Sequence, residues 1–130
     1  MTGKLPEPLI QLIEGRNFAF VATLMRDGWP QVTPVWIDHE GDLIVFNTAI
    51  GRVKQKNLAR DPRTALALVD WNNPYHRAEV RGRVVEQTTS GAEEHIDKLA
   101  KKYLGVDKYS RVPGEKRIII KIRPESIRIR

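Results

Sequence analysis

Two basic side chains at the start of a short helix are the groups in this chain with the clearest potential chemistry. Arg52 and Lys54 follow Gly51 and precede an apolar pattern that Pro62 must end, so a helix is expected to begin near Gly51. Cations are disfavoured at a helix N-terminus, where backbone N–H groups already supply positive charge, unless an anion sits there. The pair therefore predicts a phosphate site, with a solvated basic helix as the alternative.

The elements around this pair must bring the two cations together. Positions two apart in a regular helix point to nearly opposite sides, so Arg52 and Lys54 converge only if Arg52 still belongs to the incoming loop. Gly51 permits such a bend because glycine lacks a Cβ. An apolar run over residues 42–46 comes just before, so the site is expected at the end of a strand.

Short apolar or alternating runs separated by tight turns make up most of the remaining chain. Expected strands cover residues 18–25, 30–38, 43–48, 63–70 and 78–85, and one or two last strands cover 117–123 and 127–130. Two further helices are expected over 8–14 and 90–104. The chain lacks the repeated strand-helix alternation and the Gly-rich fingerprint of a dinucleotide-binding sheet. We expect a mainly β (α+β) fold, a six- to seven-stranded antiparallel barrel that is closed or nearly closed.

The composition limits the class of protein. A chain of 130 residues with 41% hydrophobic content fits one domain over 1–130, and its net charge of +6 favours negatively charged ligands. No apolar run approaches the roughly 20 residues needed to cross a bilayer, and no apolar signal segment opens the sequence, so a cytoplasmic protein is expected. The sequence has no cysteine, which excludes disulfides and zinc-cysteine sites.

A second group of candidate residues lies in an expected loop over 70–77. Trp71 and Tyr75 would expose a large aromatic area there, so a partner subunit or a ligand is expected to cover it, with folding back onto the barrel as the alternative. His76 in this loop is a candidate proton donor, whereas His95 is expected on the wet side of the last helix. The histidines form no metal cluster, and no Ser-His-acid or paired-carboxylate arrangement indicates hydrolysis.

Several short motifs follow one another in a specific order along the chain. They are Val21-Ala22-Thr23-Leu24, Asp27-Gly28-Trp29-Pro30, Val32-Thr33-Pro34-Val35-Trp36, Phe46-Asn47-Thr48, Arg52-Val53-Lys54, Asn57-Leu58, Arg60-Asp61-Pro62-Arg63, Asn73-Pro74-Tyr75 and Glu79-Val80-Arg81-Gly82. In this order the chain resembles the pyridoxamine 5'-phosphate oxidase-like flavin-binding split barrels, and within them the small deazaflavin-dependent oxidoreductases. The resemblance covers nearly the whole chain. It implies a split β-barrel homodimer with the cofactor in a groove where the two subunits meet.

The resemblance also implies roles for individual residues. Arg52 and Lys54 match the phosphate-binding pair, and residues 33–36 match the strand along which the flavin-like ring rests, although Trp36 is equally well explained as a core residue. The residues that fall where the opposite subunit's loop would help to wall the pocket are Trp71, Asn73, Pro74, Tyr75 and His76. The implied cofactor-binding residues are Thr33, Pro34, Val35, Trp36, Asn47, Thr48, Arg52, Lys54, Asn57, Trp71, Pro74 and Tyr75.

The function implied by the resemblance is a reductase that uses the deazaflavin coenzyme F420. It would pass a hydride to an unsaturated or quinone-like small molecule, and the chain would then need no nucleophile of its own. The first alternative is an FMN-binding oxidoreductase with the same fold and the same phosphate pair. The second is a small basic barrel that binds single-stranded nucleic acid, with Trp29, Trp71 and Tyr75 stacking on bases. The positive charge is not gathered into one basic arm, which argues against nucleic acid.

Overall fold

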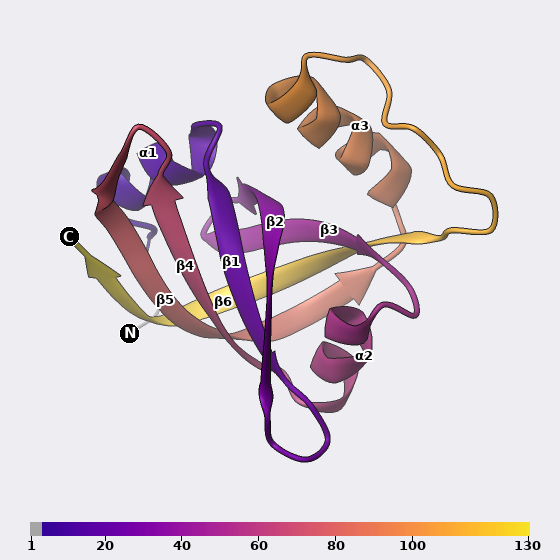
Figure 1. The fold of residues 1–130 in the computed structure, drawn as a ribbon, viewed down its shortest axis with the longest axis horizontal. Helices are drawn as coiled ribbons and strands as arrows, with labels where there is room; N and C mark the ends of the chain where they lie inside the picture. The colour runs from indigo at the N-terminus through magenta and orange to yellow at the C-terminus, as the bar shows by residue number, and fades with distance from the viewer. Residues whose placement is uncertain (1–3) are drawn as a thin grey trace.

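Six antiparallel strands close into a barrel in the computed structural model, which describes residues 4–130 (Figure 1). The strands are β1 (Phe18–Leu24), β2 (Pro30–Glu40), β3 (Leu43–Ala49), β4 (Arg63–Asp70), β5 (Asn73–Thr88) and β6 (Arg117–Ile129). Their order around the barrel is β1-β2-β3-β6-β5-β4. The helices α1 (Glu7–Glu14), α2 (Val53–Arg60) and α3 (Ala92–Leu104) lie outside it. The expected mainly β barrel with a few helices is confirmed.

The barrel core is built by strands that turn alternate apolar side chains inward. α1 adds Leu9, Leu12 and Ile13 to the same core cluster. The largest fully buried side chains on the strands are Phe46, Ile37, Ile44, Leu68, Ile120 and Ile122. Within residues 4–130, no helix is both long and apolar enough to span a membrane.

The last turns of α3 are fastened to the rest of the molecule by two polar side chains. The Lys102 ammonium donates to the carbonyl oxygens of Ile13, in α1, and Ile37, in β2. The Tyr103 hydroxyl donates to the Asn17 carbonyl at 2.6 Å and accepts from the Ile37 N–H at 3.1 Å. Burial lowers the pKa of Lys102 to about 8 and raises that of Tyr103 to about 12. These bonds hold α3 against β2.

The connection between β4 and β5 is a tight hairpin, so the expected loop over 70–77 is wrong. Trp71 and Asn72 form the turn, and β5 already begins at Asn73. The Asp70 carboxylate accepts from the Asn72 N–H at 2.9 Å, which reverses the chain within two residues. Asn73 and Pro74, which contributed to the loop prediction, therefore lie at the start of a strand.

Candidate functional site

The chain bends sharply between β3 and α2. The convergence of Arg52 and Lys54 on one site requires such a bend. Gly51 has a φ of 96°, a conformation that residues with a Cβ rarely adopt. Arg52 is the N-cap residue with extended backbone, and the helix starts at Val53, two residues after Gly51. Because Arg52 still belongs to the incoming loop, its side chain is free to point to the same side as that of Lys54.

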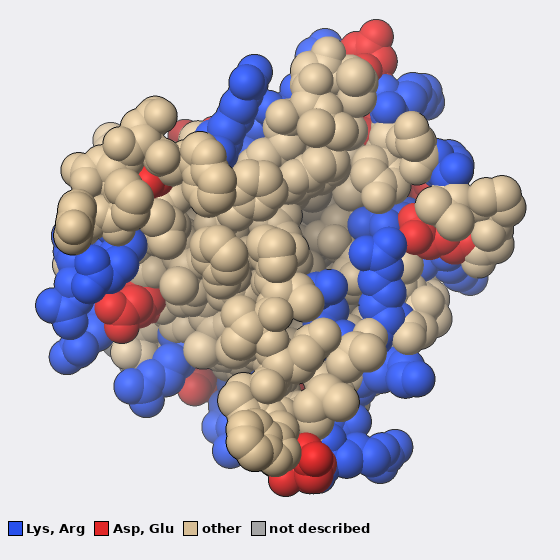
Figure 2. Space-filling model, in the orientation of Figure 1, with Lys and Arg blue, Asp and Glu red and all other residues tan. Residues whose placement is uncertain are grey.

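A pocket of about 180 Å³ lies beside this helix start. Its walls come from β2, β3, α3, the loop after α3 and the start of β6, and Figure 2 shows a hollow on this face with Lys and Arg atoms at its edge. Chain segments far apart in sequence thus meet around it. The predicted site residues that line it are Pro34, Val35, Trp36, Asn47, Thr48, Arg52 and Lys54.

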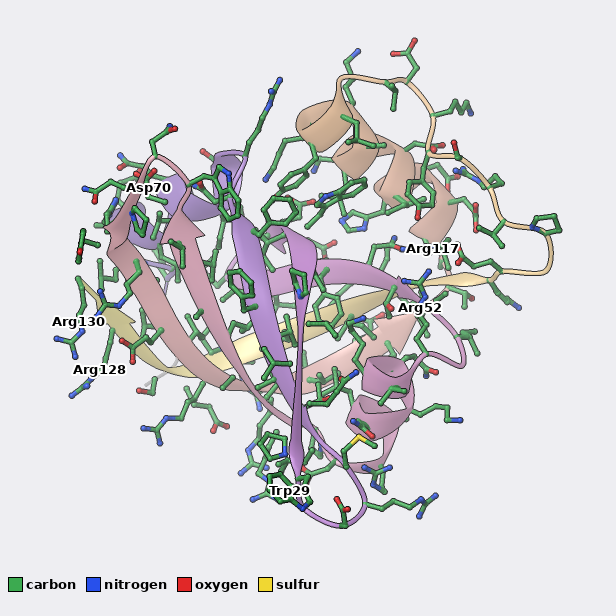
Figure 3. All side chains as sticks on the ribbon, in the orientation of Figure 1. Trp29, Arg52, Asp70, Arg117, Arg128 and Arg130 are labelled. Atoms are coloured by element: carbon green, nitrogen blue, oxygen red, sulfur yellow. The ribbon has the colours of Figure 1, made fainter. Side chains whose placement is uncertain are left out.

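Three cationic side chains line the pocket: Arg52, Lys54 and Arg117. Figure 3 shows Arg52 and Arg117 close together between α2 and α3. Lys54 and Arg117 are only 9% and 5% exposed. Within residues 4–130, no carboxylate oxygen lies within 4.0 Å of the Lys54 ammonium, whereas both arginines are paired. Burial lowers the pKa of Lys54, and the charges of Arg52 and Arg117 lower it further.

Glu115 pairs with both arginines from the loop before β6. Its two carboxylate oxygens accept from Arg52 Nη2 and Arg117 Nη1, each at 2.9 Å. Burial alone would raise the pKa of Glu115, but the hydrogen bonds and charges of Arg117 and Arg52 hold it below its ordinary value. Three cations against one carboxylate leave two positive charges, which favour a phosphate-bearing anionic ligand.

Buried polar groups without partners also point to a ligand. The Thr48 side chain is 1% exposed, and its Oγ1 atom makes no hydrogen bond within the described part of the chain. Oγ1 of Thr33, on β2, also lacks a partner within the described residues, but Thr33 does not line the pocket, in contrast to its prediction as a site residue. A buried hydroxyl without a partner costs free energy, and the N–H groups at the start of α2 receive no side-chain cap either. A bound phosphate would satisfy Thr48 and the helix start together.

Trp36 both lines the pocket and packs in an aromatic cluster. Its ring stacks on Tyr103 with centroids 5.3 Å apart, and it meets Tyr109 edge-on at 5.9 Å. The Tyr109 N–H donates to Asp97 on α3 at 2.9 Å, which ties the loop after α3 to that helix. Trp36 is therefore held firmly on β2 between the helix and the loop.

Asn57 lies away from this pocket, although it was among the predicted site residues. Its amide donates to the Thr23 hydroxyl at 3.0 Å and to the Met25 sulfur at 3.3 Å. It lines a larger groove of about 720 Å³ between α2 and the β1–β2 hairpin. The cations of that groove are all exposed, so the smaller pocket, with its buried Lys54, is the better candidate site.

The aromatic candidates on the β4–β5 hairpin also lie outside the pocket. Trp71 and Tyr75 are 60% and 82% exposed. Trp71 does not line the pocket but contacts Phe18, which does, and the two ring centroids are 5.2 Å apart. Pro74 is exposed on the same hairpin, and His76 Nδ1 lies 3.5 Å from an oxygen of Asp70. No residue of the hairpin lines the pocket within the same chain.

Arg117, which lines the pocket, and His95, which lies behind it, are among the residues that were not predicted for the site. Arg117 pairs with Ala49 of β3, and its Nε donates to Asn47 Oδ1 at 2.8 Å. The side chain of His95 is only 11% exposed, so its expected wet position is wrong. It lies three residues after Ala92, on the buried face of α3, so the helical spacing contained that signal. Arg117 had no such signal, because only the pairing of β3 with β6 places it here.

Comparisons with known proteins agree with this architecture. A family model described as pyridoxamine 5'-phosphate oxidase matches residues 5–130. A solved structure named F420 reductase is 30% identical with a TM-score of 0.83, and the match covers 95% of this chain and 98% of that one. HupZ of Group A Streptococcus is 23% identical with a TM-score of 0.71, covering 96% and 93%, which shows the shared fold alone.

Proposed function

This chain belongs to the pyridoxamine 5'-phosphate oxidase family, and we propose that it is an F420-dependent reductase acting on an unsaturated or quinone-like small molecule. The observation that carries the proposal is the buried Lys54 ammonium, which lacks a carboxylate partner within residues 4–130 and lies in a pocket with Arg52 and Arg117. Such a site supports binding of a phosphate. The likeness to the F420 reductase over nearly the full length supports a deazaflavin rather than another phosphorylated ligand.

The proposed division of labour follows from the pocket walls. F420, when bound and reduced, supplies the hydride. Arg52, Lys54 and Arg117 would hold its phosphate, with the Thr48 hydroxyl as a further hydrogen-bonding group. The β2 segment over residues 34–36 would support the ring. The work of the chain is then to bind, orient and exclude water, which agrees with the lack of a nucleophile-base pair in its sequence.

An FMN-dependent oxidoreductase is the second candidate, because the same three cations would also hold the phosphate of FMN. The likeness to the F420 reductase favours the deazaflavin. Binding of single-stranded nucleic acid finds less support in the fold. Trp29 and Asp70, which precedes Trp71, lie at opposite ends of the molecule in Figure 3, so the exposed tryptophans offer no continuous stacking surface.

Titration with each cofactor separates the first two candidates. We expect F420 to bind with a Kd of about 1 μM or tighter and FMN to bind at least about tenfold more weakly, a difference of about 1.4 kcal/mol. Quenching of cofactor fluorescence measures both affinities, and oxidation of reduced F420 in the presence of quinones and enones then tests turnover. Submicromolar binding of FMN without detectable binding of F420 would make the second candidate correct.

We also propose a homodimer that completes the cofactor site. The pocket of about 180 Å³ is smaller than the roughly 300 Å³ at which small-molecule sites usually begin, so a tricyclic ring needs further walls. The outer face of the barrel offers a surface for a second copy, since Val32 is 58% exposed there. A partner packed on this face would supply further walls for the ring. The apolar residues of the face are Phe20, Ala22, Val32, Ala65 and Ala67.

Substitution of Ala65 with arginine tests this interface. We expect the wild type to sediment as a dimer at micromolar concentration and Ala65→Arg to sediment as a monomer that binds F420 at least about tenfold more weakly, because a charge in an apolar interface costs several kcal/mol. Ala59→Arg, at an exposed position on α2, is the matched control and is expected to remain dimeric. Sedimentation of the F420-loaded wild type as a monomer would contradict the shared site.

A further inference from the structure

A chain of hydrogen bonds runs behind the pocket from β2 through α3 to β6. His95 Nε2 lies 3.1 Å from Asp38 Oδ2, and His95 Nδ1 lies 3.1 Å from Asn47 Nδ2. Asn47 Oδ1 in turn accepts from Arg117 Nε at 2.8 Å. The chain therefore connects a carboxylate at one end with a pocket-lining cation at the other.

The two ends fix the direction of these bonds. The Arg117 guanidinium can only donate. Asp38 is ionised at neutral pH: burial alone would raise its pKa, but hydrogen bonds from His95, the His39 N–H and Lys98 hold it at about 2. An ionised carboxylate can only accept. The two residues between these ends must therefore each donate on one side and accept on the other.

His95 and Asn47 meet this requirement in one arrangement. The Asn47 amide donates to the Ala92 carbonyl at 2.9 Å and to His95 Nδ1, which leaves its oxygen to accept from Arg117. His95 Nδ1 consequently carries no proton, and its Nε2–H donates to Asp38. The bonds thus define a neutral imidazole in the Nε2–H tautomer.

We infer that His95 is a positioning residue that fixes the Asn47 amide and, through it, the direction of Arg117 in the pocket. If the amide turned over, its Nδ2 would face Arg117 Nε, and two donors would oppose each other. Arg117 would then keep only Glu115, at 2.9 Å, and its position over the Tyr109 ring, at 5.2 Å from the centroid. The inference rests on the proposed function for the identity of the ligand, but it concerns how the cation is held.

Charged groups on each neighbouring element support this polarity. Lys98, on α3, reaches the same Asp38 oxygen as His95 at 3.1 Å and remains 69% exposed, so it adds a donor without entering the chain of bonds. On β6 the charged group at the end of the chain of bonds is Arg117. It forms an ion pair with Glu115, which lies in the loop before β6. Within residues 4–130, Asp38 is the only carboxylate paired with His95.

Three substitutions of His95 separate positioning from packing. Asparagine places an amide oxygen near the position of Nδ1 and keeps the acceptor for Asn47. Glutamine reaches toward Asp38 but offers no acceptor at Nδ1, and leucine fills the space with neither group. We expect His95→Asn to bind F420 within about threefold of the wild type, and His95→Gln and His95→Leu to bind about tenfold more weakly, the loss of one hydrogen bond to a charged group. Equal losses in all three variants, in proportion to their melting temperatures, would indicate a structural role and overturn the inference.

Nitrogen-15 NMR of the cofactor-free protein supplies a test that needs no cofactor. We expect the imidazole of His95 to show the Nε2-protonated tautomer. The Arg117 Nε–H signal should shift in His95→Gln and His95→Leu but stay near its wild-type position in His95→Asn. An Nδ1-protonated tautomer, or an Arg117 signal indifferent to all three variants, would overturn the inference. If neither F420 nor FMN binds the wild type, the proposed function fails, and these two NMR signals still decide the inference.

Discussion

Lys54→Met is expected to weaken F420 binding by about 100-fold, or about 2.7 kcal/mol, because hydrogen bonds to a desolvated charge are worth more than exposed ones. The same change should leave the cofactor-free protein as stable as the wild type, or more stable by about 1 kcal/mol, since methionine fills the space without a buried charge. Fluorescence titration measures the affinity, and urea unfolding measures the stability. Opposite signs in these two measurements would mark a residue kept for binding at the expense of stability.

The pH dependence gives an independent check of the same side chain. Burial and the neighbouring arginines lower the pKa of Lys54, so it becomes neutral at a lower pH than an exposed lysine. A neutral lysine holds phosphate poorly, and affinity should therefore fall as the pH rises through that lowered pKa. This fall should be absent in Lys54→Met.

Lys101→Met is the matched control, because it removes the same charge from an exposed position on α3. We expect its affinity for F420 to stay within about twofold of the wild type, since exposed charges are largely screened. If both variants lost affinity equally, the effect would be one of overall charge, and the pocket would not be the phosphate site. Wild-type affinity in Lys54→Met would rule out the pocket directly.

Arg117→Met is expected to differ from Lys54→Met, because it should lose stability as well as affinity for F420. It removes the donor from buried Asn47 Oδ1, and within residues 4–130 it leaves Glu115 paired only with the half-exposed Arg52. We expect a decrease of about 3 kcal/mol in the free energy of unfolding, at the lower end of what breaking a buried pair costs, and a melting temperature lower by roughly 10 °C. F420 binding should weaken as well, because one of the three cations is gone.

Arg117→Lys is the informative partner of this variant. It keeps the positive charge but cannot reproduce the guanidinium geometry that bonds Asn47 and Glu115 together. We expect intermediate stability by urea unfolding and intermediate affinity. An Arg117→Met variant as stable as the wild type would show that the buried hydrogen bonds of this arginine contribute nothing to the fold.

The local part of the site could be derived from the sequence. Cations at a helix start conflict with the helix dipole unless an anion sits there. Gly51 indicated the bend that leaves Arg52 in the loop, where it can converge with Lys54. The barrel itself followed from the periodicity and turns of the strands, and β4 matches its expected range of 63–70. Such features depend on residues within a few positions of one another, which is the range over which propensity and periodicity act.

The distant part of the site could not be derived in the same way. Arg117 reaches Asn47 across 70 residues of chain, and its burial depends on the register of β6 beside β3. His95 was expected on the wet side of the last helix, although its spacing from Ala92 puts it on the buried face of α3. Burial of a polar residue depends on the partners that satisfy it. The partners of His95 are Asp38, on β2, and Asn47, on β3.

The ammonium of Lys102 joins three segments of the chain, namely α3, β2 and the end of α1. Its bonds to Ile13 and Ile37 mean that α3 cannot lift from β2 without also freeing the end of α1. Amide protons of the two helices should therefore exchange with solvent as one cooperative unit.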